Sequence, residues 1–237
     1  MVNAAEKLEY PGQHQTEATA AARRYHDWIL REFKPYIGNA VAEVGAGTGH
    51  FSERLLNLGI EQLDAFEPSE NMFPLLHERL RSIPNARAVK EFFGRGGHTS
   101  GFDTVLYVNV LEHIEDDVAE LARAYETLKP GGHLLVFVPA LQWLHGDLDR
   151  RVGHHRRYYK RDLVAKVREA GFTIAKAKYF DSAGVLPWYV GFVLLDGSIT
   201  VNKASLYDAV AVPIVSRIER FIPPPIGKNV LVVGRKS

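Results

Sequence analysis

The stretch from Ala42 to His50, AEVGAGTGH, constrains this sequence more than any other part of it. Apolar residues lead into it from Ile37 and Val41, glycines then recur at every second position, and a helical pattern begins at Phe51. This order of strand, glycine-rich turn and helix lets the backbone approach a ligand closely, because glycine has no Cβ. Glu67, at the end of the following strand, stands where an acid would bind ribose hydroxyls. The stretch therefore predicts a nucleoside-cofactor site.

The composition argues against several other classes of function. The 237 residues allow one large α/β domain, and a net charge of +1 gives no global field toward nucleic acid or membranes. The lack of cysteine excludes disulfides, thiolate nucleophiles and cysteine-based zinc sites. The N-terminus has no apolar signal-peptide region, and the longest apolar run, 183–195, is too short to span a bilayer. We therefore expect a cytoplasmic protein without a transmembrane segment.

Alternating strand and helix patterns predict an α/β fold, doubly wound around a mainly parallel sheet. Strands are predicted at 40–44, 62–66, 86–92, 102–108, 133–138, 173–180 and 229–233. Helices are predicted at 16–33, 51–58, 69–82 with Ser69 as N-cap, 116–128, 161–170, 185–195 and 206–221. Residues 1–15 are expected to form a mobile arm, and 141–160 a polar, His-rich segment without regular periodicity.

The turn does not have the spacing of the common nucleotide-binding loops. A dinucleotide fingerprint is G-x-G-x-x-G, and His50 occupies the position of its third glycine. No Lys-Ser/Thr pair follows the glycines, so a P-loop is excluded. A nicotinamide-dependent oxidoreductase is therefore the alternative rather than the preferred interpretation.

Several motifs occur in one order along the chain: Glu43 before the turn, Glu67, Phe102-Asp103, the NVLEHI stretch at 109–114 and the LKPGG stretch at 128–132. With them the chain resembles the class I S-adenosylmethionine-dependent methyltransferases of the small-molecule kind. The resemblance is specific over residues 41–138 and looser beyond. It implies a Rossmann-like, seven-stranded sheet whose last strand is antiparallel, in a single domain spanning 1–237. That domain would comprise an N-terminal helix or flap (16–36), a cofactor-binding core (37–139) and an acceptor-side half (140–237) with a helical insertion at 182–228.

The resemblance also implies the cofactor, S-adenosylmethionine, with S-adenosylhomocysteine as product. Glu43 would help hold the ammonium, and Glu67 would accept hydrogen bonds from both ribose hydroxyls. The turn would touch the methionyl part, and Asn109 would close the pocket beneath the sulfonium. The full set of expected cofactor contacts is Glu43, Gly45, Ala46, Gly47, Glu67, Pro68, Met72, Glu91, Phe92, Asn109 and Val110.

The acceptor side is expected after the strand at 133–138, where Asp149, Gly153, His154, Arg156, Arg157 and Tyr158 match a D…G-H-x-R-R-Y segment of some of these methyltransferases. An imidazole can take a proton near neutral pH, so His154 is the candidate general base, and a guanidinium can bind an acceptor carboxylate or phosphate. The catalytic candidates are His154, His113 and Tyr158. The candidate acceptor contacts are Tyr25, Trp28, His145, Arg156, Arg157 and Trp188. Each of these residues also has a purely structural interpretation.

The sequence leaves the acceptor, and whether the protein is catalytic, open. A non-catalytic protein that binds S-adenosylmethionine would carry the same donor motifs. The acceptor is expected to be a small apolar or anionic molecule, methylated on oxygen, nitrogen or carbon. Nucleic acid is not expected, because the charge is balanced, and no metal site is expected, because no pair of carboxylates has ligand spacing. The apolar insertion could cover the acceptor, form a homodimer contact or touch lipid, and the protein is expected to be a monomer or a homodimer.

Overall fold

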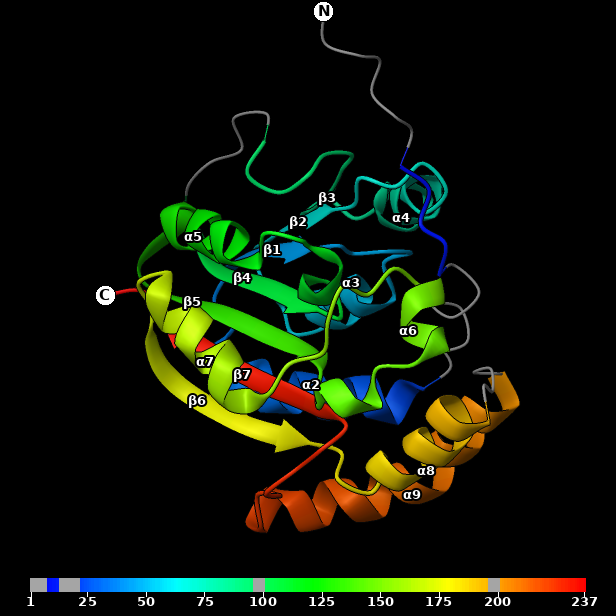
Figure 1. Ribbon diagram of the computed structural model, residues 1–237. Coiled ribbons are helices and arrows are strands. Elements are labelled where there is room, and N and C mark those ends of the chain that lie inside the picture. The colour runs from blue at the N-terminus through cyan, green and yellow to red at the C-terminus, as the bar shows by residue number, and fades with distance from the viewer. Residues whose placement is uncertain (1–7, 13–21, 96–100, 196–200) are drawn as a thin grey trace, which may run out of the picture.

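The computed structural model describes residues 8–12, 22–95, 101–195 and 201–237, which form a seven-stranded sheet (Figure 1). The strands are β1 (Ala40–Val44), β2 (Gln62–Phe66), β3 (Ala86–Val89), β4 (Phe102–Val108), β5 (Leu128–Pro139), β6 (Thr173–Phe180) and β7 (Asn229–Arg235). Their order is β3-β2-β1-β4-β5-β7-β6, and β7 runs antiparallel to both of its neighbours. The predicted fold class is confirmed.

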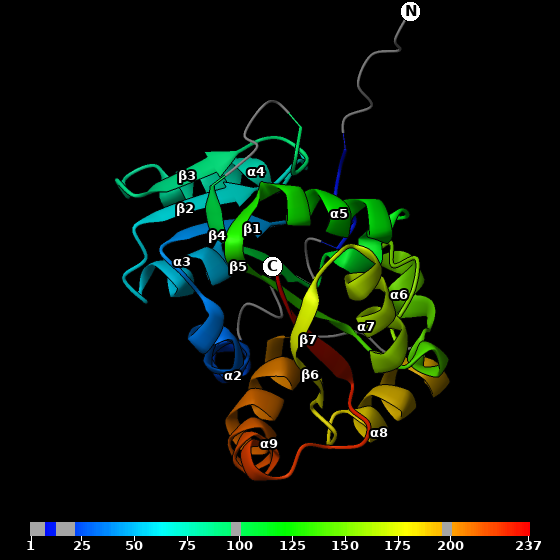
Figure 2. The ribbon, with the colours of Figure 1, turned by 90° about the vertical axis from the view of Figure 1, so that its left-hand side faces the viewer.

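Helices cover both faces of the sheet, as Figure 2 shows from the side. The first face carries α2 (Arg23–Phe33), α3 (His50–Leu56), α4 (Phe73–Leu80) and α9 (Val201–Phe221); the second carries α5 (Asp117–Thr127) and α7 (Lys160–Glu169). Each face has its own apolar core, the first around Trp28 and Phe180 and the second around Tyr107 and Phe172. The parallel strands are thus buried on both sides, which explains their nearly continuous apolar sequences.

Most strand bounds follow the sequence pattern, and the exceptions have local causes. Strands β1, β2, β4 and β6 begin and end where predicted. Strand β5 is longer, because Leu128 pairs with Phe102 ahead of the predicted start at His133. The predicted N-cap at Ser69 is wrong: α4 begins at Phe73, and the backbone and hydroxyl of Ser69 bind Glu67 instead.

The carboxyl edge of the sheet carries elements that the sequence pattern did not predict. These are the short helix α6 (Asp147–Arg151) and the 3₁₀ turns η2 (Leu111–His113) and η3 (Gln142–Leu144). The prediction of a mobile arm is wrong for residues 8–12, which pack against the segment before α4, at Asn71. The Asn71 side chain accepts a hydrogen bond from the Tyr10 backbone N–H and donates one to its carbonyl, both at 2.9 Å.

The insertion before β7 consists of α8 (Val185–Trp188), the π-helical segment η4 (Tyr189–Leu194) and α9. Two buried acids fix α9 to the rest of the molecule. Asp208 accepts hydrogen bonds from the backbone N–H groups of Arg24 and Tyr25, and Glu219 accepts one from that of Ser182. Within the described ranges, no helix combines the length and the apolar character needed to cross a membrane.

Candidate functional site

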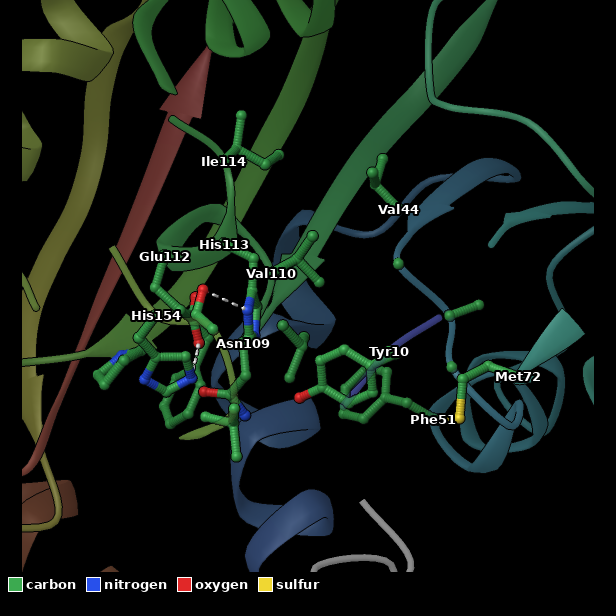
Figure 3. Close-up of a pocket in the computed structure, with 18 of the residues that line it drawn as sticks. Tyr10, Val44, Phe51, Met72, Asn109, Val110, Glu112, His113, Ile114 and His154 are labelled. Carbon is green, nitrogen blue, oxygen red and sulfur yellow. Dashed lines mark hydrogen bonds and ion pairs between the residues drawn. The ribbon is translucent and has the colours of Figure 1, made fainter. Parts of the chain in front are cut away.

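A cavity of about 1100 Å³ lies at the carboxyl edge of the sheet. One end, which we call the turn end, is lined by residues 43–48 and 66–69 and by Met72. The other, the histidine end, is lined by Glu112, His113, His154, Arg157 and Trp188. Figure 3 shows Asn109 and Val110 between the two groups and Tyr10 across the opening. The Tyr10 ring contacts the His113 ring edge-on at 5.4 Å, so the docked segment 8–12 forms part of the wall.

At the turn end, the backbone itself shapes the cavity. Gly45 has φ +67°, and a Cβ added there would lie 2.5 Å from Cγ2 of Val110. The Ala46 N–H donates to the Phe66 carbonyl at 3.0 Å, which ties the turn to the end of β2. A side chain at position 45 would be both strained and blocked, so glycine is required here.

Glu67 is buried between the turn and the start of the next segment. Its carboxylate accepts hydrogen bonds from the backbone N–H groups of Gly47 and Ser69, each at 2.9 Å. These bonds fix the carboxylate at the cavity wall, immediately beside the turn. A carboxylate held in this way is suited to accept hydrogen bonds from a ligand's hydroxyls.

Two further acids test whether the cavity fits the cofactor expected from the sequence. Glu43 lines the turn end, accepts a hydrogen bond from the Ser52 hydroxyl at 2.5 Å, and has its pKa raised by burial to about 8. Glu91 lines the same end, and its buried Oε2 has no hydrogen-bond partner among the described residues. A ligand with an ammonium and an amino group would supply what these two acids lack, so the residues fit such a cofactor.

Asn109 is one of three non-glycine residues with positive φ in the described chain, at φ 54°. Its N–H donates to the Phe137 carbonyl at 2.8 Å, which holds the strained conformation at the end of β4. Strain of this kind concentrates at functional sites, and Asn109 lines the cavity between its two ends. All of the expected cofactor contacts, from Glu43 to Val110, line this cavity.

At the histidine end, Asp149 orients His154. The imidazole Nδ1 lies 2.6 Å from Asp149 Oδ1, and Arg157 Nε and Nη2 donate to the same carboxylate at 2.8 and 3.0 Å. Burial would raise the pKa of Asp149, but the hydrogen bonds from His154 and Arg157 and the charge of Arg157 lower it to about 2. Since a carboxylate only accepts, Nδ1 of His154 donates to Asp149, and in the neutral imidazole this tautomer leaves the lone pair on Nε2.

His113 is held in a similar way. Its Nδ1 lies 3.2 Å from the Gly153 carbonyl, and its ring contacts that of His154 at 4.6 Å. Burial and the neighbouring His154 lower the pKa of His113 to about 4. It is therefore a neutral imidazole at physiological pH.

Glu112 is a site residue that the sequence reasoning missed. Its side chain is fully buried, and neither oxygen has a hydrogen-bond partner among the described residues. Burial raises the pKa of Glu112 to about 8. The available signal was its place beside His113 at the end of β4. Glu112, His113 and His154 each offer a potential metal ligand within 4.8 Å of the others.

Four predicted site residues, Trp28, His145, Arg156 and Tyr158, do not line the cavity. Trp28 is 1% exposed and packs on Phe180 with ring centroids 3.8 Å apart. The Tyr158 hydroxyl and the Arg156 guanidinium both bind Asp117, at 2.8 and 2.9 Å. His145 Nε2 lies 3.3 Å from the carbonyl of His154. The side chains of Tyr158, Arg156 and His145 are thus bound within the protein itself.

The other predicted acceptor contacts, Tyr25, Arg157 and Trp188, do line the cavity. The Tyr25 hydroxyl donates to Asn229 Oδ1 at 2.9 Å. Arg157 lies over the Trp188 ring at 4.7 Å, but its guanidinium is bound by Asp149. Arg157 is therefore placed to support the site rather than to bind an anion.

Comparison with known proteins gives matches over the central part of the chain. Residues 42–134 match the family model described as a methyltransferase domain. The chain is 32% identical over 104 residues to the ubiquinone biosynthesis O-methyltransferase of Cereibacter sphaeroides, covering 43% of this chain and 41% of that protein. It is 27% identical over 111 residues to the tRNA U34 carboxymethyltransferase of Campylobacter hominis, covering 46% and 39%. The chain thus spans about two fifths of the length of these curated relatives.

Among solved structures, similarity extends over nearly the whole chain. A chain of the complex between the Haloferax volcanii Trm112 methyltransferase activator and a methyltransferase superposes with a TM-score of 0.68. The match covers 98% of this chain and 99% of that one at 14% identity. At that identity the likeness concerns the fold alone.

Proposed function

We propose that the chain, whose residues 42–134 match a methyltransferase domain, is a class I S-adenosylmethionine-dependent methyltransferase that transfers the methyl group to a small-molecule acceptor. The observation that carries this proposal is the single cavity that joins the turn end to the histidine end. Methyl transfer is an in-line displacement that depends on holding acceptor and methyl carbon in line, away from water. A continuous cavity provides room for both.

In this proposal the cofactor occupies the turn end. Glu67 accepts hydrogen bonds from the ribose hydroxyls, and Glu43 faces the ammonium. Pro68 and Met72 would pack against the adenine, and Glu91 would accept a hydrogen bond from its amino group. The supporting observations are the fixed carboxylate of Glu67, the raised pKa of Glu43 and the unpartnered oxygen of Glu91.

The acceptor occupies the histidine end, where His154 acts as general base and Asp149 orients it. Nε2 of His154 would take the hydroxyl proton of the acceptor. S-adenosylmethionine held at the turn end would supply the methyl group to the hydroxyl oxygen and, with its carbon–sulfur bond broken, would leave as the neutral thioether S-adenosylhomocysteine. The tautomer set by Asp149 supports this role, because it leaves Nε2 able to accept a proton.

The lining of the histidine end favours a small acceptor with an apolar part. Trp188, Phe192 and Tyr207 line it, all from the insertion before β7. A nucleic-acid acceptor is less well supported, although one relative is a tRNA U34 carboxymethyltransferase. Four arginines of the segment 150–161, at the cavity's acceptor side, are paired with acids: Arg150 with Asp147, Arg156 with Asp117, Arg157 with Asp149 and Arg161 with Asp162.

The test is transfer of a tritiated methyl group from S-adenosylmethionine to a panel of hydroxylated aromatic and isoprenoid molecules, with bulk tRNA as a separate arm. We expect label in a small molecule and a loss of that label in His154→Ala. Label in tRNA alone would contradict the acceptor class. Persistent absence of any labelled product, with cofactor binding intact, would support a non-catalytic binding protein.

A further inference from the structure

The outward face of α9 carries an apolar stripe with no partner in the described chain. Leu206, Val210, Ile214 and Ile218 recur at every fourth position, with Phe221 on the same side, and these five side chains are 54–80% exposed. Residues spaced by three or four lie along one face of a helix. We call this set the α9 stripe. Monomeric proteins seldom expose contiguous apolar surface of this kind, so it marks an interaction surface.

The charges of α9 are divided between its two faces. Asp208 and Glu219 are buried and bound to backbone N–H groups of the protein. Arg217 and Arg220 are exposed. The outward face therefore combines large apolar side chains with cations and lacks an exposed acid along the whole of α9. Long basic side chains can lay their stems along apolar surface while the charged ends reach anionic groups.

This charge pattern distinguishes the two obvious occupants of the α9 stripe. In a two-fold dimer through this face, the exposed cations of one copy would lie against those of the other, with no acid on α9 to pair them. An anionic bilayer would instead receive the apolar side chains between its headgroups and pair the cations with phosphate. The observations thus favour a lipid surface.

The segment 185–195, which precedes α9, also exposes large apolar side chains. Leu186, Leu194 and Leu195 are 59–72% exposed, and residues 185–195 contain no charged side chain. Both views place α8 and α9 at the same end of the molecule, away from α4 and α5 (Figures 1 and 2). We propose that the α9 stripe, with its flanking cations, docks the protein in the plane of an anionic membrane surface.

Vesicle flotation of purified protein tests this proposal, with vesicles of phosphatidylglycerol and phosphatidylcholine compared with phosphatidylcholine alone. We expect the wild type to float with the anionic vesicles and to be released as salt increases. The stripe variant Leu206→Ser/Val210→Ser/Ile214→Ser and the charge variant Arg217→Glu/Arg220→Glu should each bind at least about tenfold more weakly. The matched control is Leu75→Ser/Arg81→Glu, at α4 and the residue that follows it, where both side chains are also exposed, and it should bind as the wild type does.

The substituted side chains are exposed, so the variants should keep wild-type melting temperatures and S-adenosylhomocysteine binding. These two measurements separate a failure of the docking surface from a failure of the proposed function. The docking proposal is overturned if the wild type does not float with anionic vesicles, or if the stripe variant floats equally well. It is also overturned if sedimentation velocity shows a wild-type dimer that the stripe variant dissociates, without vesicle binding.

Discussion

The two ends of the cavity are built in different ways. The turn end is made by residues close together in the sequence, and its key contacts involve backbone: the positive φ of Gly45 and the N–H groups that bind Glu67. The histidine end is made by side chains from separate segments, held by the pairing of Asp149 with His154 and Arg157. The first end suits one invariant ligand, whereas the second can be remodelled by changing side chains.

Because the turn end is shaped by backbone, substitutions there should abolish cofactor binding. The largest effect is expected for Gly45→Val. Strain at positive φ and the clash with Val110 each cost about 1–3 kcal/mol, so we expect cofactor affinity to fall by about 1000-fold. Titration calorimetry with S-adenosylhomocysteine measures the effect. Gly59→Val is the matched control, because Gly59 also has positive φ but a Cβ there meets nothing within 4 Å. Equal loss in both variants would assign the effect to strain alone.

At the histidine end, His154→Ala should lower turnover and leave cofactor affinity unchanged. Loss of a general base reduces kcat by about 100-fold. Single-turnover transfer to an acceptor found in the labelling screen measures this, with His155→Ala as the control from the same segment. A drop in S-adenosylhomocysteine affinity as large as the drop in turnover would show that the two ends are not independent.

Glu112 should make stability depend on pH. An unfolded glutamate loses its proton near pH 4.5, whereas folded Glu112 keeps it to about pH 8. The folded state binds more protons in this window, so the free energy of unfolding should fall as pH rises through it. In Glu112→Gln this loss disappears, and the variant should gain about 3–4 kcal/mol over the wild type between pH 5 and pH 8, because one pKa unit corresponds to about 1.4 kcal/mol.

Urea unfolding at several pH values gives the comparison, with Glu115→Gln at an exposed position as control. Parallel pH profiles for Glu112→Gln and the wild type would show that the Glu112 carboxyl is not isolated from solvent.

The same contrast explains how much could be predicted from the sequence. The turn, the acids Glu43 and Glu67 and the bounds of β1, β2 and β4 follow from local patterns, because backbone conformation and strand burial leave a local signature. The roles of Arg156, Tyr158 and Trp28 do not. Whether an arginine is free or paired depends on acids such as Asp117, which the fold brings from far along the chain.

Some elements lacked any periodic signal. Helix α6 is too short to show one, and segment 8–12 is held by the Asn71 side chain rather than by a pattern of its own. Glu112 was visible in the NVLEHI stretch, but its isolation from hydrogen-bond partners is a property of the packed structure. At the histidine end, the sequence therefore could not show which side chains pair, because the partners lie far apart along the chain.

The central claim is that the turn end binds S-adenosylmethionine through Glu67, and calorimetric titration with S-adenosylhomocysteine tests it most directly. The wild type should bind one equivalent with micromolar affinity. Glu67→Ala should stay folded at the assay temperature, with a lower melting temperature because Gly47 and Ser69 lose their acceptor, and should show no detectable binding. A wild type that fails to bind S-adenosylhomocysteine but binds NADH in a fluorescence titration would contradict it.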